Sequence, residues 1–280
     1  MRELVAPNWD AFDDYEAIVS RSVGPNKVTR EAYRDDVRER YQAYLDCAPD
    51  LENMVSVVAE GPPRDAHMRS CYGHEHMRDV KHRISALQRD PYLLRFCQFC
   101  GGMAVVSQWD HYLPQAEFPE FAACAYNITP ICGVCNHTKR ERGTTQGARE
   151  VVHVFYDDIP SDLAYLEATI VWSAEGPDII FSPSMPAGGD QQFFALFCRH
   201  VDALALEDRF ADYYRIQLER EAKKIAKSVR RGLELEVIRD LLRDSAESEP
   251  GGPSSPLAAL LRAAADSDRF LEYAASGAGQ

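Results

Sequence analysis

The stretch CQFCGGMAVVSQWDHYLPQAEFPEFAACAYNITPICGVCNHTK, residues 97–139, decides the fold of this chain. It contains two CxxC pairs, Cys97/Cys100 and Cys132/Cys135, with 31 residues between them. A gap of two residues lets both thiolates of a pair turn onto one metal ion, and two such pairs supply the tetrahedral sulfur set that Zn²⁺ prefers. The sequence therefore predicts one structural zinc site.

Two disulfide bonds or ordinary buried cysteines are the alternative for the same pattern. The N-terminal sequence MRELVAPNWDAFDDYE lacks the basic-then-apolar order of a signal peptide. No apolar run approaches the roughly 18 residues of a membrane span. We therefore expect a cytoplasmic protein without membrane contact, in reducing surroundings that disfavour disulfides. The remaining cysteines are expected to be spectators: Cys47, Cys71, Cys124 and Cys198.

Polar residues typical of catalytic sites lie between and just after the cysteine pairs. The apolar, β-branched run MAVVSQW predicts a strand that ends at Asp110 and His111. A loop with two prolines separates it from a second predicted strand, NITPI, which opens with Asn127. NHTKRER follows the second pair without Gly or Pro and predicts a helix that starts near Asn136. This order of elements would bring the four polar residues into one small cleft, although a surface loop also explains an isolated Asp-His pair.

The succession DHYLP, Asn127 and CGVCNHTK resembles the HNH endonuclease family, whose ββα-metal core has a DH pair, a middle Asn and a CxxC[HN]xxK end. More narrowly, DHYLPQAEFPEF followed by NITPICGVCN is similar to the DHYLPK-type branch of bacterial HNH proteins. The resemblance covers about 45 residues. It implies an α+β fold, with a zinc-stabilised ββα-metal core flanked by N- and C-terminal helices and a small antiparallel sheet.

The resemblance also implies phosphodiester hydrolysis, which needs a base for water and a cation for the developing charge. His111 is the implied base, because an imidazole titrates near neutral pH, and Asn127 would accept from its ring and fix the tautomer. Asp110 and Asn136 offer hard oxygen ligands that suit Mg²⁺ or Mn²⁺. The third motif position holds Asn136 with a histidine displaced to His137, so either is an implied ligand, and His137 would favour Mn²⁺, Ni²⁺ or Zn²⁺.

Basic residues occur at two places in an otherwise acidic chain. Lys139, Arg140 and Arg142 follow the motif and are candidates for contacts with phosphates, although a solvated helix end explains them too. The stretch from Arg215 to Arg231 is a second candidate, with a solvated helix face as its alternative. The net charge of −13, from 31 basic and 44 acidic residues, opposes phosphate binding. Affinity for DNA would then depend on a local basic face or on a partner.

Four regions are predicted along the chain: an N-terminal helical region 1–90, an HNH nuclease core 91–150, a small sheet with C-terminal helices 151–244, and a mobile linker and tail 245–280. VVHVFYDDI, YLEATIVWS and DIIFS predict the strands of the small sheet. SAESEPGGPSSP has the composition of a mobile linker, and the apolar segment after it predicts a short helix that docks on a partner.

The resemblance implies a metal-dependent endonuclease acting on DNA, as an effector or cleavage subunit of a bacterial restriction or phage-defence system. A partner ATPase, another subunit or a second copy of the chain would accompany it. The alternative is a non-catalytic zinc ribbon that binds DNA or protein, which has no need for Asp110, His111 and Asn127. RNA is a weaker choice of substrate, because the sequence has no aromatic RNA-recognition signature.

Overall fold

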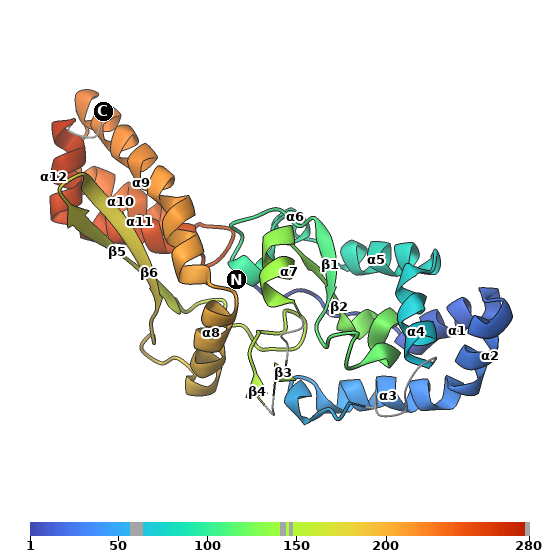
Figure 1. Ribbon diagram of the computed structural model, residues 1–280. Helices are drawn as coiled ribbons and strands as arrows, with labels where there is room; N and C mark the ends of the chain where they lie inside the picture. Colours follow the sequence, from blue (N-terminus) through green and yellow to red (C-terminus); the bar gives the residue numbers. More distant parts are fainter. Residues whose placement is uncertain (57–63, 141–143, 146–147, 278–280) are drawn as a thin grey trace. The chain divides into compact units, whose positions relative to one another are not determined.

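The computed structural model describes residues 1–56, 64–140, 144–145 and 148–277, which form two compact units (Figure 1). The motif unit comprises Glu3–Cys97 and Val105–Asp158, and the C-terminal unit comprises Ile159–Gln280 with Met1–Arg2 and Gln98–Ala104. Helices predominate in both, and the strands form small antiparallel sheets. The predicted α+β class is confirmed. Within the described residues, no helix has the length and apolarity that a membrane crossing requires.

The N-terminal part of the motif unit is helical, as predicted. Its elements are α1 (Ala11–Arg21), α2 (Gly24–Ala32), α3 (Arg34–Cys47), η1 (Leu51–Asn53), α4 (Arg64–Arg69), η3 (Ser70–Gly73), α5 (His76–Leu87) and α6 (Pro91–Arg95). The aromatic stripe of α3 lies in the core, where Tyr44 packs edge-on against Phe121. In α5 the buried residues Met77, Val80 and Ile84 recur at helical spacing, so this helix is amphipathic.

The motif folds as two strands and a helix. Strands β1 (Gln108–His111) and β2 (Ile128–Ile131) pair antiparallel, with Asp110 opposite Thr129 and His111 opposite Ile128. The connection contains η5 (Pro119–Ala123) and η6 (Ala125–Asn127). Helix α7 (Gly133–Lys139) begins before the predicted start, because the Cys132 sulfur accepts from the Cys135 N–H and caps it. A short hairpin, β3 (Thr144–Thr145) with β4 (Ala148–Arg149), follows.

The predicted strand at 151–159 is wrong, because this segment turns around His153 instead of pairing. The His153 carbonyl accepts from the N–H groups of Tyr156 and Asp157 at 3.2 and 3.1 Å, and its own N–H donates to the Asp157 carboxylate at 2.7 Å. Val152 and Val154 are buried together with His153, so the alternation of buried and exposed residues that indicated a strand is absent. The carbonyls of Val151 and Val154 accept from the Tyr112 hydroxyl and the Leu4 N–H, each at 2.7 Å, and not from a neighbouring strand.

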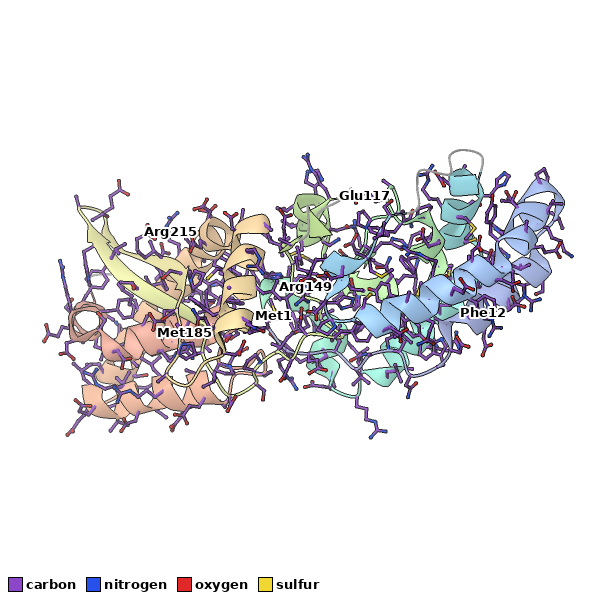
Figure 2. The ribbon with its side chains drawn as sticks, turned by 90° about the horizontal axis from the view of Figure 1, so that it is seen from below. Met1, Phe12, Glu117, Arg149, Met185 and Arg215 are labelled. Carbon is purple, nitrogen blue, oxygen red and sulfur yellow. The ribbon has the colours of Figure 1, made fainter. Side chains whose placement is uncertain are left out.

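Over its described residues, the C-terminal unit combines one hairpin with five α-helices and the short 3-10 helix η4 (Gln98–Cys100). Its elements are β5 (Leu166–Ser173), β6 (Gly176–Pro183), α8 (Gln191–Ala203), α9 (Leu206–Arg230), α10 (Leu235–Glu247), α11 (Pro256–Asp266) and α12 (Asp268–Ser276). Both predicted strands of this hairpin are confirmed, and α9 packs against β6 while α11 packs against β5. Arg215 of α9, which is labelled in Figure 2, forms an ion pair with Asp178 of β6 at 2.8 Å, so this cation of the basic stretch is partly neutralised.

The predicted mobile linker and tail is instead folded over most of its length. Ser254 is buried, and its hydroxyl accepts from the Tyr165 N–H and donates to the Leu163 carbonyl, each at 2.9 Å. Ser255 caps α11 by accepting from the Ala258 N–H. The apolar face of α11 is buried within the unit, mainly against β5 and α10. This helix therefore completes the hydrophobic core of its own chain.

Candidate active site and cysteine cluster

The four motif cysteines lie together. The sulfur atoms of Cys97, Cys100, Cys132 and Cys135 are all within 4.8 Å of one another, and all four residues are buried. Four sulfurs at about 2.3 Å from one ion would be about 3.8 Å apart in a tetrahedron, so this cluster has the size of a metal site. The prediction that these cysteines could hold one metal ion is confirmed.

The spectator cysteines lie outside that cluster. Burial raises the pKa of the Cys71 thiol to about 11 and raises the pKa of the Cys124 thiol strongly. A thiol must lose its proton to act as a nucleophile or a metal ligand. Cys71 and Cys124 therefore stay protonated at neutral pH and act as small apolar residues.

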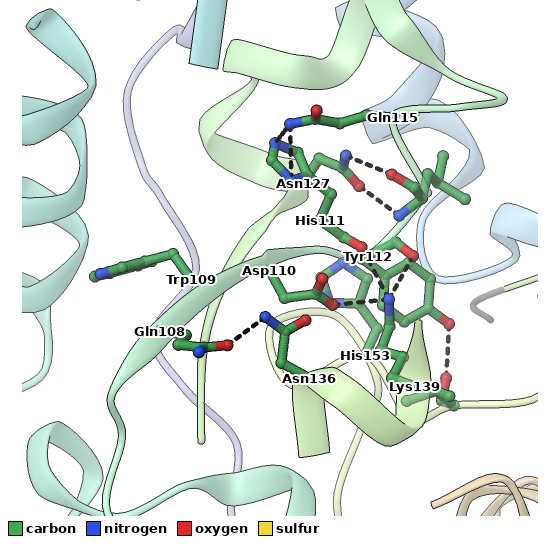
Figure 3. A network of polar contacts seen from close by, with 12 residues as sticks. Gln108, Trp109, Asp110, His111, Tyr112, Gln115, Asn127, Asn136, Lys139 and His153 are labelled. Atoms are coloured by element: carbon green, nitrogen blue, oxygen red, sulfur yellow. Dashed lines mark hydrogen bonds and ion pairs between the residues drawn. The ribbon is translucent and has the colours of Figure 1, made fainter. Parts of the chain in front are cut away.

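Strand β1 directs its polar side chains to two different places, because successive residues of a strand point to opposite faces. Gln108 and Asp110 point toward α7. His111 instead lies against Tyr72 and the Ala122 carbonyl. Figure 3 shows this division, with the Asp110 carboxylate near α7 and the His111 ring near Gln115.

Two contacts hold α7 against β1. The Asn136 amide nitrogen donates to Gln108 Oε1 at 2.6 Å, and Lys139 Nζ lies 2.8 Å from Asp110 Oδ2. Because residues three apart share one face of a helix, these contacts bring the Asn136 side chain beside the Asp110 carboxylate (Figure 3). His137 lies on the exposed side of α7. The geometry brings Asp110 and Asn136 together and leaves His137 apart from them.

The prediction that Lys139 contacts phosphate is contradicted by its burial. Its side chain has no exposed surface, and its ammonium group donates to the carbonyls of His111 and Tyr112 at 2.9 and 3.3 Å while pairing with Asp110. A buried ammonium group is stable only when such partners replace water. Lys139 therefore fixes the end of β1 on α7.

The structure describes Arg140 but not Arg142, the other two cations predicted to contact phosphate. Arg140 is exposed, and its N–H donates to the Asn136 carbonyl at 3.0 Å at the end of α7. Its side chain is available, so a phosphate contact stays a prediction. Arg142 lies outside the described residues.

His111 is a buried imidazole, with 8% of its surface exposed. Burial lowers its pKa to about 4, while the Ala122 carbonyl and the Asp110 carboxylate act in the opposite direction. The ring is therefore neutral at pH 7. Nε2 lies 2.9 Å from the Ala122 carbonyl oxygen, so it must carry the proton and donate. The lone pair is then on Nδ1, and the Gln115 amide nitrogen lies against both ring nitrogens, 3.1 Å from Nδ1 and 2.8 Å from Nε2.

Asn127 does not contact the His111 ring, so the predicted tautomer-fixing role is wrong. Its Oδ1 accepts from the Leu113 N–H at 2.7 Å, and its Nδ2 donates to the Leu113 carbonyl at 3.0 Å. The Tyr44 hydroxyl also donates to Oδ1 at 3.3 Å. The fully buried Asn127 amide thus satisfies the backbone at the start of the loop after His111, and the Ala122 carbonyl orients the imidazole instead.

Replacing Asn127 with alanine should lower the free energy of unfolding by about 2–4 kcal/mol, because both Leu113 backbone groups lose their partner in a buried place. Urea denaturation measures the change. Asn136→Ala is the matched control: its hydrogen bond to Gln108 is exposed, so its loss should cost less than about 1 kcal/mol. Equal stability of Asn127→Ala and the parent would show that the Leu113 groups find other partners.

Three residues beside His111 were not identified from the sequence. Gln115, four residues along the loop, reaches the imidazole, and Tyr72 of η3 packs edge-on against it with ring centroids 4.5 Å apart. Lys81 of α5 places its ammonium group 4.0 Å from the centroid of the Tyr72 ring. Gln115 could have been suspected from its spacing to His111. No local pattern links Tyr72 or Lys81 to the motif, since they reach it only through the packing of η3 and α5.

Comparisons with known proteins place few constraints on this site. The chain is 30% identical over 118 residues to protein Ea31 of Escherichia phage lambda. The aligned part covers 41% of this chain and 39% of that protein, so the similarity spans about two fifths of either. No protein-family model and no solved structure matches the chain.

Proposed function

We propose that this protein is a metal-dependent endonuclease of the HNH type that hydrolyses phosphodiester bonds in DNA. One observation carries the proposal: consecutive residues of strand β1 carry a neutral imidazole, His111, on one face and the Asp110 carboxylate, which lies beside the Asn136 amide, on the other. Hydrolysis of a phosphodiester requires a base for water and hard oxygen donors for a cation, and this strand and α7 supply both. The resemblance of the motif to HNH endonucleases supports the same reaction.

His111 would act as the general base through Nδ1. The Ala122 carbonyl holds the proton on Nε2, which leaves the Nδ1 lone pair to take a proton from water. The water oxygen then attacks phosphorus, and the bond from phosphorus to the leaving ribose oxygen breaks. Gln115 must first move from the ring, because its amide nitrogen lies within 3.1 Å of Nδ1 and 2.8 Å of Nε2.

Asp110 and Asn136 would hold Mg²⁺ or Mn²⁺, which neutralises charge that develops on the phosphate. Their donor set is suitable for a hard cation. Lys139 binds Asp110 Oδ2 and leaves the other carboxylate oxygen available, while Asn136 uses its amide nitrogen on Gln108 and leaves its amide oxygen. The exposed His137 points away from this pair, so we assign the ligand role to Asn136. In the cysteine cluster we propose Zn²⁺, which favours four thiolates.

Plasmid cleavage with the divalent ion varied tests the function. We expect nicked and linear DNA with Mg²⁺ or Mn²⁺, and none after EDTA treatment that leaves the cysteine-bound zinc in place. Asn136→Ala should weaken Mn²⁺ binding, measured by electron paramagnetic resonance, by about tenfold or more. His137→Ala should leave binding within about twofold. Weaker binding in His137→Ala alone would reverse the ligand assignment.

A zinc-containing module that binds DNA or protein without cleavage is the second candidate. The low accessibility of His111 favours this candidate, because only 8% of this residue is exposed and Gln115 contacts its ring. The plasmid assay separates the two: a binding module gives no divalent-ion-dependent product at any protein concentration.

A role as effector or cleavage subunit in restriction or phage defence is a further part of the proposal, and it rests on the resemblance alone. The net charge of −13 gives a reason for a partner. Long-range repulsion would hold an acidic chain away from DNA, so a partner ATPase, another subunit or a second copy would supply affinity.

A further inference from the structure

We propose that Lys81, which lies outside the motif, is the cation that contacts a DNA phosphate at the candidate site, with Tyr72 as its positioning residue. This inference rests on the proposed function and names how the site binds its substrate. Lys81 would make the phosphate contact that the sequence indicated for Lys139, which is buried.

The geometry places Lys81 one aromatic ring away from the proposed base. Its ammonium group lies 4.0 Å from the centroid of the Tyr72 ring, and that ring packs edge-on against His111 at a centroid distance of 4.5 Å. The Tyr72 hydroxyl donates to the Trp109 carbonyl of β1 at 3.2 Å, which fixes the ring against the strand that carries Asp110 and His111. Tyr72 therefore holds the lysine head group at the edge of the site.

Lys81 differs from the neighbouring cations in its partners. Lys139 pairs with Asp110, Arg149 with Asp157, and Arg83 with Asp14. Among the ion pairs of the described residues, none includes Lys81. An ammonium group has three N–H donors, and the face of a tyrosine ring attracts its charge without accepting a directed hydrogen bond for each of them.

The surroundings of Lys81 favour an anionic ligand. The side chain is half-buried, and loss of water lowers the pKa of its ammonium group. A partly desolvated cation without a carboxylate partner gains more from a phosphate oxygen than a fully hydrated one does. Tyr72 adds a hydrophobic and aromatic wall, so the pair resembles the combinations of cation and aromatic ring that line nucleic-acid sites.

DNA binding as a function of salt tests this contact without depending on cleavage. The binding constant of a short duplex is measured at several salt concentrations in the His111→Ala background, where no strand is cut. Each phosphate contact contributes about 0.9 to the slope of log K against log salt. Lys81→Gln should reduce that slope by about 1 and weaken binding at low salt, and Lys81→Arg should restore most of it.

Lys27→Gln is the matched control, since it removes the same charge from another half-buried lysine of the motif unit, one that is paired with Glu31. It should leave the slope unchanged. The proposal is overturned if Lys81→Gln and Lys27→Gln have the same slope, or if the duplex does not bind at all.

A cleavage measurement then separates this inference from the proposed function. With His111 present, Lys81→Gln should cut plasmid about 10–100-fold more slowly than the parent, in keeping with the loss of one contact to charged phosphate. If the parent cuts DNA and Lys81→Gln cuts equally well, the role of Lys81 is wrong and the endonuclease stands. If the parent does not cut DNA but its salt slope depends on Lys81, the contact stands and the endonuclease is wrong.

Discussion

Replacing His111 with alanine should lower the rate of DNA cleavage by about 10²–10⁴-fold, the usual contribution of a positioned general base. The side chain touches only Tyr72, Gln115 and the Ala122 carbonyl among the contacts described above, and it takes no part in the cysteine cluster. The zinc content and the circular dichroism spectrum should therefore match those of the parent. Initial rates of plasmid nicking at saturating Mg²⁺ measure the effect.

His137→Ala is the control for this experiment, because it removes a histidine of the same motif from the exposed side of α7. Its rate should stay within about twofold of the parent, a change expected of a surface substitution. Retention of most of the cleavage in His111→Ala would remove His111 from the mechanism.

The pH dependence of cleavage follows from the same burial. A general base acts only in its neutral form, and the pKa of His111 is lowered to about 4. As far as the protonation of His111 controls it, the cleavage rate should therefore be constant from pH 8 down to about pH 5 and fall as the pH approaches 4. An unperturbed histidine would already lose activity near pH 6.5.

Replacing Cys132 with serine should abolish tight zinc binding and unfold the motif region. Cys132 contributes one of the clustered sulfurs and also caps α7, the helix that carries Asn136 and Lys139. Zinc binding contributes about 10–16 kcal/mol in zinc-finger peptides, which is comparable to the whole stability of a typical domain, about 5–15 kcal/mol. Loss of one ligand would thus remove much of the free energy that holds the elements of the candidate site together.

Metal analysis by mass spectrometry and urea unfolding measure this change. We expect about one zinc per chain in the parent and well below one in Cys132→Ser, with unfolding at lower urea. Cys198→Ser is the matched control, since Cys198 is only half-buried and lies outside the cluster. A Cys132→Ser protein that keeps its zinc and its unfolding midpoint would contradict a structural metal at this cluster.

The elements that carry the motif were predictable because their signals are local. The spacing of Cys97/Cys100 and Cys132/Cys135 depends only on how short turns present thiolates, and the four sulfurs do meet. The apolar, β-branched residues before His111 and after Asn127 indicated two strands. The second forms as β2, whereas β1 begins only at Gln108, and of the apolar run before it Val105 makes an isolated bridge to Phe96. The helix after the second pair began earlier than predicted, since a cysteine is not among the usual capping residues.

The sequence by itself determined the α+β class, the cysteine cluster and the order of β1, β2 and α7, because short-range turn chemistry and hydrophobic periodicity specify them. Only the tertiary structure decided the partners of the polar residues. Lys139 is buried and pairs with Asp110, and the Asn127 amide binds the backbone of Leu113. Lys81 contacts the Tyr72 ring, which packs against His111, the proposed base. The type of a charged or polar side chain does not reveal whether water or another residue will satisfy it. That depends on which distant segments bury it, since removal of water makes an unpaired charge costly and selects its partner.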